Sequence, residues 1–258
     1  MVAQEASVPR SQTSASQPAK DPGAKARTLL DSMLKALGGQ AFLSYETMAQ
    51  QGRTYSFYQG EPSGTGTLFW RFWRYPDKER IELTKDRDVV YIHNGDRGYE
   101  VTFKGTAPEE DKLLDEFIRR RQHSMEIVTR EWLKDPATIV LYVGTAVADQ
   151  KFVEQISIIN ARNDQVTISI DPLTNLPIRK SFTWRDEERY KNEETEVYAN
   201  YRQVQGIMTP FTISRLKDGL MASQRFLSSV QFNTPIEMAK FEAKTTYDPF
   251  PSRRSKKQ

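Results

Sequence analysis

Few side chains of this chain are suited to catalysis or metal binding, and they lie far apart in the sequence. The chain has two histidines, His93 and His123, and no cysteine in 258 residues. Zinc sites and acid–base catalysis usually need several clustered donors, and neither histidine lies in an H-x-x-x-H or similar spacing. The lack of cysteine excludes disulfides, thiolate metal sites, a cysteine nucleophile and an N-terminal lipid-modified cysteine in this sequence. We therefore expect no metal site and no catalytic histidine.

Carboxylates, serines and glycines give no stronger signal. Acidic runs at 109–111 and 186–188 could bind a cation, but a helix start and a solvated loop explain such runs more simply. The serines at 228–229 lack the context of a nucleophile elbow, and the glycines between 60 and 66 do not lead from a strand into a helix as a phosphate loop does. Nothing here specifies an enzyme, so we expect no catalytic residues and no cofactor.

The basic residues do not form a nucleic-acid site. The chain has 37 basic and 34 acidic residues, a formal charge of +3, and no concentrated basic face. Basic runs at 119–121 and 253–257 could contact anionic lipid headgroups, although a solvated face or tail is the commoner role for such runs. We expect no nucleic-acid partner, and leave open an envelope membrane protein or a membrane surface as partner.

Alternating aromatic or β-branched runs, closed by turns of Asp, Asn, Gly or Pro, recur along the chain and predict a curved antiparallel sheet. The expected strands lie near 47–58, 66–75, 79–85, 88–94, 97–103, 138–143, 151–160, 164–171, 177–186, 193–203, 210–217 and 220–232. Apolar residues at helical spacing predict an amphipathic helix from about 21 to 38 and a second helical stretch over 108–133, with a break near Ser124. Several strands are apolar on both faces, so helices or a ligand must cover the second face.

The two ends of the chain differ from this pattern. Residues 1–23 are rich in Ser, Gln, Ala and Pro and predict a disordered tail, and 246–258 form a basic tail, leaving one domain at 24–245. The N-terminal segment lacks the apolar core of a signal peptide, and no apolar run approaches the roughly 18 residues needed to cross a bilayer. A tail of this kind often follows a cleaved signal, while a cytoplasmic protein with an unstructured start remains the alternative.

The order of several short motifs resembles the LolA/LolB-like lipoprotein-localization superfamily over roughly residues 25 to 242. The similarity is greatest to its larger bacterial members, called outer-membrane lipoprotein-sorting proteins. The motifs are Leu37-Gly38-Gly39, the segments 75–83, 94–99, 170–178 and 200–206, and Pro210-Phe211. These motifs consist of residues that form turns, so they indicate the fold better than the function. The lipobox cysteine of the anchored LolB type is missing, and no residue aligns with the lid arginine of the superfamily's carrier.

The resemblance implies an α+β fold: an unclosed, strongly curved antiparallel barrel whose concave side is covered by two or three helices and holds an apolar cavity for acyl chains. The implied function is a non-catalytic periplasmic carrier that binds lipid or lipoprotein acyl chains as a monomer. The alternative is a structural or interaction module of the envelope with a packed interior and no ligand.

The aromatic strand at 67–75 is the best candidate for the cavity wall. Residues two apart share a face, so one side carries Leu68, Trp70 and Phe72 and the other carries Phe69, Trp73 and Tyr75. We predict a lining of Leu68, Trp70, Phe72, Ile81, Leu83, Tyr91 and Tyr99. The inward face is not determined by the spacing, because a slip of one residue exchanges Trp70 for Trp73.

Overall fold

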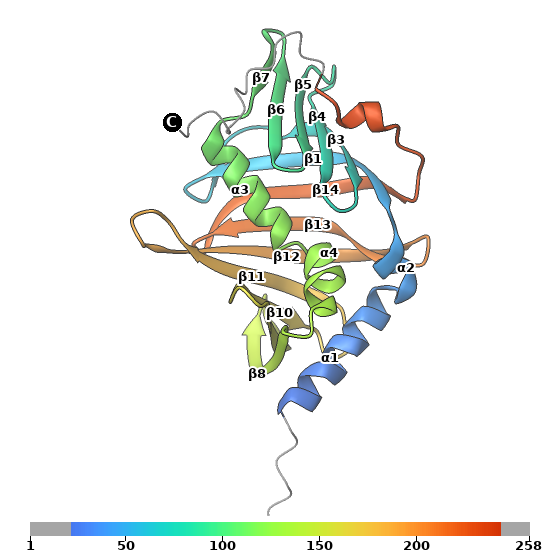
Figure 1. The fold of residues 1–258 in the computed structure, drawn as a ribbon, viewed down its shortest axis with the longest axis vertical. Helices are drawn as coiled ribbons and strands as arrows, with labels where there is room; N and C mark the ends of the chain where they lie inside the picture. Colours follow the sequence, from blue (N-terminus) through green and yellow to red (C-terminus); the bar gives the residue numbers. More distant parts are fainter. Residues whose placement is uncertain (1–21, 244–258) are drawn as a thin grey trace, which may run out of the picture.

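One antiparallel sheet runs through the computed structural model, which describes residues 22–243 (Figure 1). It has 14 strands, ordered β7-β6-β5-β4-β3-β1-β14-β13-β12-β11-β10-β9-β8, with the short β2 paired to β1 outside this order. The strands are β1 (Thr47–Tyr58), β2 (Glu61–Pro62), β3 (Thr67–Arg74), β4 (Lys78–Leu83), β5 (Val89–Asn94), β6 (Arg97–Thr102), β7 (Gly105–Pro108), β8 (Ile139–Ala148), β9 (Lys151–Ile159), β10 (Gln165–Ile170), β11 (Pro177–Arg185), β12 (Lys191–Val204), β13 (Ile207–Lys217) and β14 (Leu220–Phe232). The end strands β7 and β8 do not pair with each other, so the sheet is curved but unclosed, and the predicted α+β fold is confirmed.

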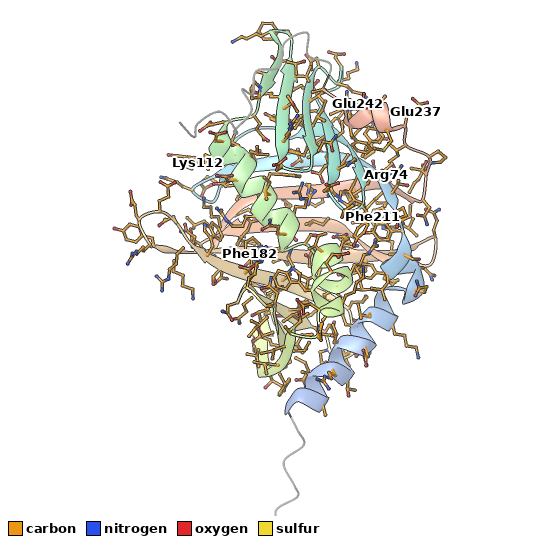
Figure 2. All side chains as sticks on the ribbon, in the orientation of Figure 1. Arg74, Lys112, Phe182, Phe211, Glu237 and Glu242 are labelled. Carbon is orange, nitrogen blue, oxygen red and sulfur yellow. The ribbon has the colours of Figure 1, made fainter. Side chains whose placement is uncertain are left out.

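Helices cover the concave face of this sheet. The helical segments are α1 (Pro22–Leu37), α2 (Gln40–Ser44), α3 (Asp111–Gln122), α4 (Met125–Arg130) and the 3-10 turns η1 (Trp132–Lys134) and η2 (Met238–Phe241). Helices α3 and α4 cross in front of the central strands, and α1 packs against β8, β9 and β13 (Figure 1). The turn η2 packs against β4 and β5 from the other face, and Figure 2 labels Glu237 and Glu242 at its two ends.

The helix boundaries have local causes. Helix α1 ends as predicted at Gly38-Gly39, where the Gly39 amide donates to the Leu34 carbonyl at 2.8 Å. Gly38 has φ +126°, and a Cβ there would lie 2.5 Å from the carbonyl oxygen of Gly206, so only glycine lets the helix end this close to the β12–β13 turn. The predicted break at Ser124 is confirmed, since its Oγ accepts a hydrogen bond from the Ile127 amide and caps α4.

The second helical stretch begins later than predicted. Residues 105–108 pair with β6 as the unexpected strand β7, and α3 starts only at Asp111. Pro108 therefore ends a strand and does not open a helix. Proline is compatible with this place because β7 is an edge strand whose outer side needs no backbone donor.

A single large core joins the sheet to its helices. Leu30 and Met33 of α1 belong to the same buried cluster as four fully buried isoleucines of β9 and β10, Ile156, Ile158, Ile168 and Ile170. At the end of α3, His123 stacks on Phe182 of β11 with 4.3 Å between ring centroids. The isoleucine-rich strands β9 and β10 are thus apolar on their inner face, where they share one core with α1.

The edge strand β8 is interrupted by a β-bulge. Its pairing with β9 shifts between Tyr142 and Gly144, and Gly144 has φ +133°. Ile139, Leu141 and Val143 of this strand are exposed. The bulge therefore divides the outer edge of the sheet into two short regular pieces.

The expected tails at 1–23 and 246–258 lie outside the described residues, except that Pro22 and Gly23 already belong to α1. The expected domain limits at 24 and 245 stay predictions for this reason. Within residues 22–243, no helix is both long and apolar enough to cross a membrane.

Candidate functional site

A cavity of about 380 Å³ lies between the concave face of the sheet and α3. One part of its wall is apolar and consists of Phe69, Trp73, Ile81, Leu83, Tyr91 and Phe117. Phe117 comes from α3 and stacks on His93 of β5 with 3.4 Å between ring centroids, so the helix is held over this part of the sheet. A volume of this size falls within the range of small-molecule pockets.

A smaller cavity of about 150 Å³ adjoins the first, beneath α2 and α4. The two share the residues Arg71, Ser124, Glu126, Glu196, Ile213 and Arg225. The boundary between them is therefore largely polar and charged, although the sequence predicted an apolar interior.

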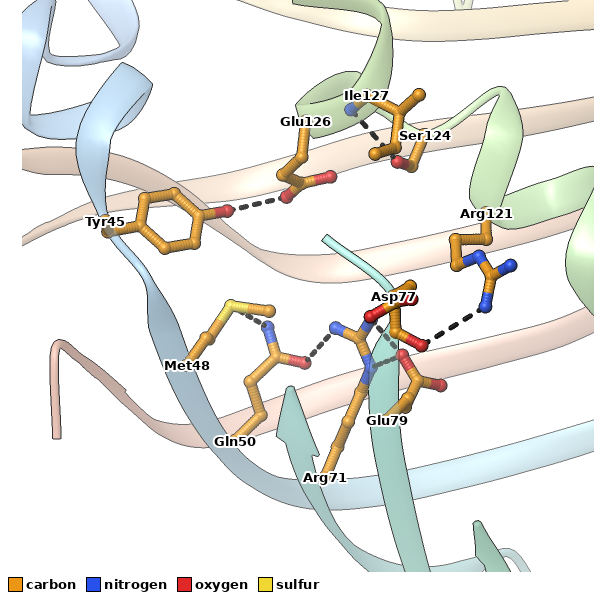
Figure 3. Close-up of polar contacts among 10 residues, drawn as sticks. All are labelled: Tyr45, Met48, Gln50, Arg71, Asp77, Glu79, Arg121, Ser124, Glu126 and Ile127. Atoms are coloured by element: carbon orange, nitrogen blue, oxygen red, sulfur yellow. Dashed lines mark hydrogen bonds and ion pairs between the residues drawn. The ribbon is translucent and has the colours of Figure 1, made fainter. Parts of the chain in front are cut away.

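The charged groups at this boundary form defined networks. Arg71 of β3 donates to Glu79 of β4 through Nε (2.8 Å) and Nη2 (2.5 Å), and to Gln50 of β1 through Nη1 at 3.3 Å (Figure 3). Burial alone would raise the pKa of Glu79, but the charge and hydrogen bonds of Arg71 outweigh burial and lower it. On the helix side, the Tyr45 hydroxyl donates to Glu126 of α4 at 2.7 Å.

A second buried ion pair crosses β11 and β12. Lys180 lies 2.9 Å from Glu196 and donates to the His123 carbonyl at 2.8 Å, and the Tyr198 hydroxyl donates to Glu196 at 2.7 Å. Burial acts to raise the pKa of Glu196, but the charge and hydrogen bond of Lys180, with smaller effects of Arg225 and Tyr198, lower it to about 2. Glu196 is therefore a carboxylate that already has its partners.

Two arginines differ from these pairs. Arg215 of β13 and Arg225 of β14 line the larger cavity, and within residues 22–243 neither guanidinium makes a hydrogen bond or an ion pair. Burial, together with repulsion from neighbouring arginines, lowers the pKa of both, so their environment disfavours the positive charge. Arg120 and Arg121, which the sequence placed on a solvated face of the helix, also line this cavity.

The predicted lining residues lie on two faces of the sheet. Ile81, Leu83 and Tyr91 line the concave cavity. Leu68, Trp70, Phe72 and Tyr99 do not, because the cross-strand pairs Trp70↔Glu82, Phe72↔Arg80 and Ile92↔Tyr99 place them on the opposite face. The seven residues therefore do not form one wall. On β3 the concave cavity is lined by Trp73, which takes the place of Trp70 when the strand is shifted by one residue.

The inward face of β3, which the spacing leaves open, has a charged residue at its centre. It carries Phe69, Arg71 and Trp73, so an arginine sits between two aromatics, whereas the outward face carries Leu68, Trp70 and Phe72 in succession and has an arginine, Arg74, only at the end of the strand. Apolar alternation favours the second face as the buried one. The arginine points inward because Glu79 on the neighbouring strand neutralises it, a pairing that depends on the register and is invisible in the strand taken alone.

Another cavity, of about 770 Å³, lies on the convex face beneath η2. Its lining includes Phe72, Arg80 and Ile92 from the sheet and extends to Glu242, next to the last described residue. The concave cavity is lined by the sheet and by the α3–α4 segment, away from the ends of the described chain, and we take it as the candidate site for that reason.

Neither histidine takes part in a metal cluster. His93 Nε2 lies 2.7 Å from a carboxylate oxygen of Glu109, and His123 Nδ1 lies 2.8 Å from the Arg119 carbonyl. In the part of the chain that the structure describes, no group of three or more His, Asp or Glu side chains could hold a metal ion. Both imidazoles instead stack on phenylalanine rings between a helix and the sheet.

No family model and no curated protein matches the chain. Several solved structures match the chain in fold with a probability of 1.00, although their sequence identity to it is low. A DUF1329 family protein from Desulfovibrio piger has a TM-score of 0.58 at 10% identity, covering 86% of this chain and 98% of that one. A putative outer membrane lipoprotein-sorting protein domain from Vibrio parahaemolyticus has a TM-score of 0.55 at 14% identity (84% and 97% covered), and a LolA superfamily protein from Nitrosomonas europaea has 0.50 at 12% (84% and 97%). The chain therefore has a LolA-like fold.

Proposed function

We propose that the protein is a non-catalytic carrier or receptor that binds the acyl chain of a lipid or lipoprotein in the periplasm of a bacterial envelope. The concave cavity of about 380 Å³ carries this proposal, because six apolar side chains form a continuous part of its wall. Burial of apolar surface at about 25 cal/mol per Å² can hold an acyl chain without any reaction. The likeness to a putative lipoprotein-sorting domain supports the same function. An interaction module with a packed interior has no use for such a cavity.

A pair of matched substitutions tests where the chain binds. Ile81→Trp adds bulk inside the cavity without adding charge, and we expect it to weaken binding of a palmitoyl chain at least tenfold. Leu68→Trp adds the same ring on the opposite face of the neighbouring strand and should leave the affinity within a factor of two. Native mass spectrometry of delipidated protein, titrated with monopalmitoylglycerol, measures both. Equal binding by the two variants would remove the cavity from the proposal, and failure of the unmodified protein to bind any palmitoyl amphiphile, neutral or anionic, would refute the carrier function.

A further inference from the structure

The lining of the concave cavity carries an excess of positive charge. The lining has five arginines, Arg71, Arg120, Arg121, Arg215 and Arg225, and three glutamates, Glu79, Glu126 and Glu196, so it carries two more positive than negative charges. Arg120 is also paired with Glu116 and Glu194 outside the lining. An acyl chain alone has no group that would bind these positive charges. The excess of positive charge therefore indicates the charge of the ligand's other end, its head group.

The carboxylates in the wall are already engaged by protein groups. Glu79 accepts from Arg71, Glu126 accepts from the Tyr45 hydroxyl, and Glu196 is paired with Lys180. None of the three is therefore left to neutralise a second arginine at hydrogen-bond distance.

Arg215 and Arg225 are the arginines of the lining that make no hydrogen bond or ion pair within residues 22–243, although Glu196 lies across the ladder from Arg215 and acts on both at longer range. Arg225 pairs across the strands with Ile213, and Arg215 pairs with Ser223, so the two arginines are diagonal neighbours on the same face of β13 and β14. Diagonal neighbours in a sheet lie about 7–8 Å apart, which lets two long side chains reach a single anion. Both side chains are half-buried, because their guanidinium groups face the cavity and do not lie in the packed core.

Unpaired cations in such a place are costly to the fold. A buried charge without a partner is strongly disfavoured, and these two arginines also repel each other. On balance their surroundings disfavour the positive charge in spite of nearby glutamates, so a role in binding explains these arginines better than a role in packing.

Building on the proposed function, we propose that the ligand is an anionic amphiphile, whose acyl chain lies along Phe69, Trp73 and Phe117 and whose carboxylate or phosphate group binds Arg215 and Arg225. The guanidinium fork gives paired hydrogen bonds to the oxygens of either anion. Arg225 lies in the wall of both cavities, so an anion bound there would sit where the two meet.

Three probes with the same 16-carbon chain test the head group: palmitoyl-lysophosphatidic acid, hexadecanoate and the neutral monopalmitoylglycerol. Binding to delipidated protein is followed by isothermal titration calorimetry below the micelle concentration of each probe. We expect at least one anionic probe to bind ten times or more tightly than the neutral probe, with an affinity that falls as salt is raised. Preference for the phosphate probe would identify a phospholipid-type head, and preference for hexadecanoate a fatty acid.

Two variants and one control then locate the anion. Arg225→Gln and Arg215→Gln should each weaken anionic binding at least tenfold and leave neutral binding within a factor of two. Arg53→Gln, an exposed arginine on the opposite face of β1, should change neither. Thermal melting should show both cavity variants to be at least as stable as the unmodified protein, and should one of them fail to fold, the other gives the same test from the neighbouring strand.

Different negative results distinguish the head-group assignment from the proposed function. Equal affinity for neutral and anionic probes, or anionic binding unaffected by both cavity variants, would overturn the head-group assignment and leave acyl-chain binding intact. If none of the three probes binds, the proposed function fails, and the head-group assignment fails with it.

Discussion

Replacing Lys180 with methionine should destabilise the fold more than almost any other charge removal. The side chain is only 2% exposed, and its ammonium both faces Glu196 at 2.9 Å and donates to the His123 carbonyl at 2.8 Å. The pKa of Glu196, about 2 against an ordinary 4.5, corresponds to roughly 3 kcal/mol of stabilisation of its carboxylate, most of it from Lys180. Loss of one partner of a buried pair costs about 3–5 kcal/mol, so we expect a loss of about 3 kcal/mol in the free energy of unfolding at pH 7.

Urea denaturation across the acid range measures this effect and its sign. In the unmodified protein the pKa of Glu196 is lowered on folding, so its stabilisation is complete above pH 4.5 and is lost as the pH falls toward 2. In Lys180→Met that part of the pH dependence should largely disappear. Lys134→Met is the control, because it breaks an exposed pair with Glu131 that is worth at most about 1 kcal/mol. A loss below about 1 kcal/mol in Lys180→Met, with an unchanged acid profile, would refute the assignment of Lys180 as the main partner.

Two further substitutions test how the helices are fixed to the sheet, each measured by urea denaturation. Gly38→Ala places a Cβ 2.5 Å from the Gly206 carbonyl oxygen at φ +126°, and should cost about 2 kcal/mol or more; a loss below about 0.5 kcal/mol would show that the α1 end tolerates a side chain. Tyr45→Phe removes the hydrogen bond to the Glu126 carboxylate and should cost about 1.5–3 kcal/mol, and unchanged stability would mean that this bond does not hold α4 in place.

The strands were predictable from the sequence because each alternating run is bounded by its own turn. The β10–β11 turn, for example, is closed by the Asp171 carboxylate, which accepts from the Leu173 amide, so the local residues determine where the chain reverses. The strand β7 was missed because four residues without alternation give no periodic signal. Pro108 at its end favoured a helix start instead.

The cavity was less predictable than the fold because its lining depends on pairings between distant segments. Arg71 and Arg225 come from strands separated by about 150 residues of sequence, and only the sheet order places them in one wall. The face of β3 could not be chosen from alternation, since each face carries apolar residues and one arginine. The spacing of apolar residues two apart still found Ile81, Leu83 and Tyr91, which lie on the concave face of β4 and β5.

The bulge in β8 limits the pairing of this edge strand with other extended chains. An open sheet offers a free row of amide and carbonyl groups to any other extended chain, and β8 does so beside the exposed Ile139, Leu141 and Val143. Fibril-forming segments usually need six or seven regular residues in a row. The break between Tyr142 and Gly144 leaves four residues before it and five after it, so neither piece of this edge is long enough to seed a stack of identical strands.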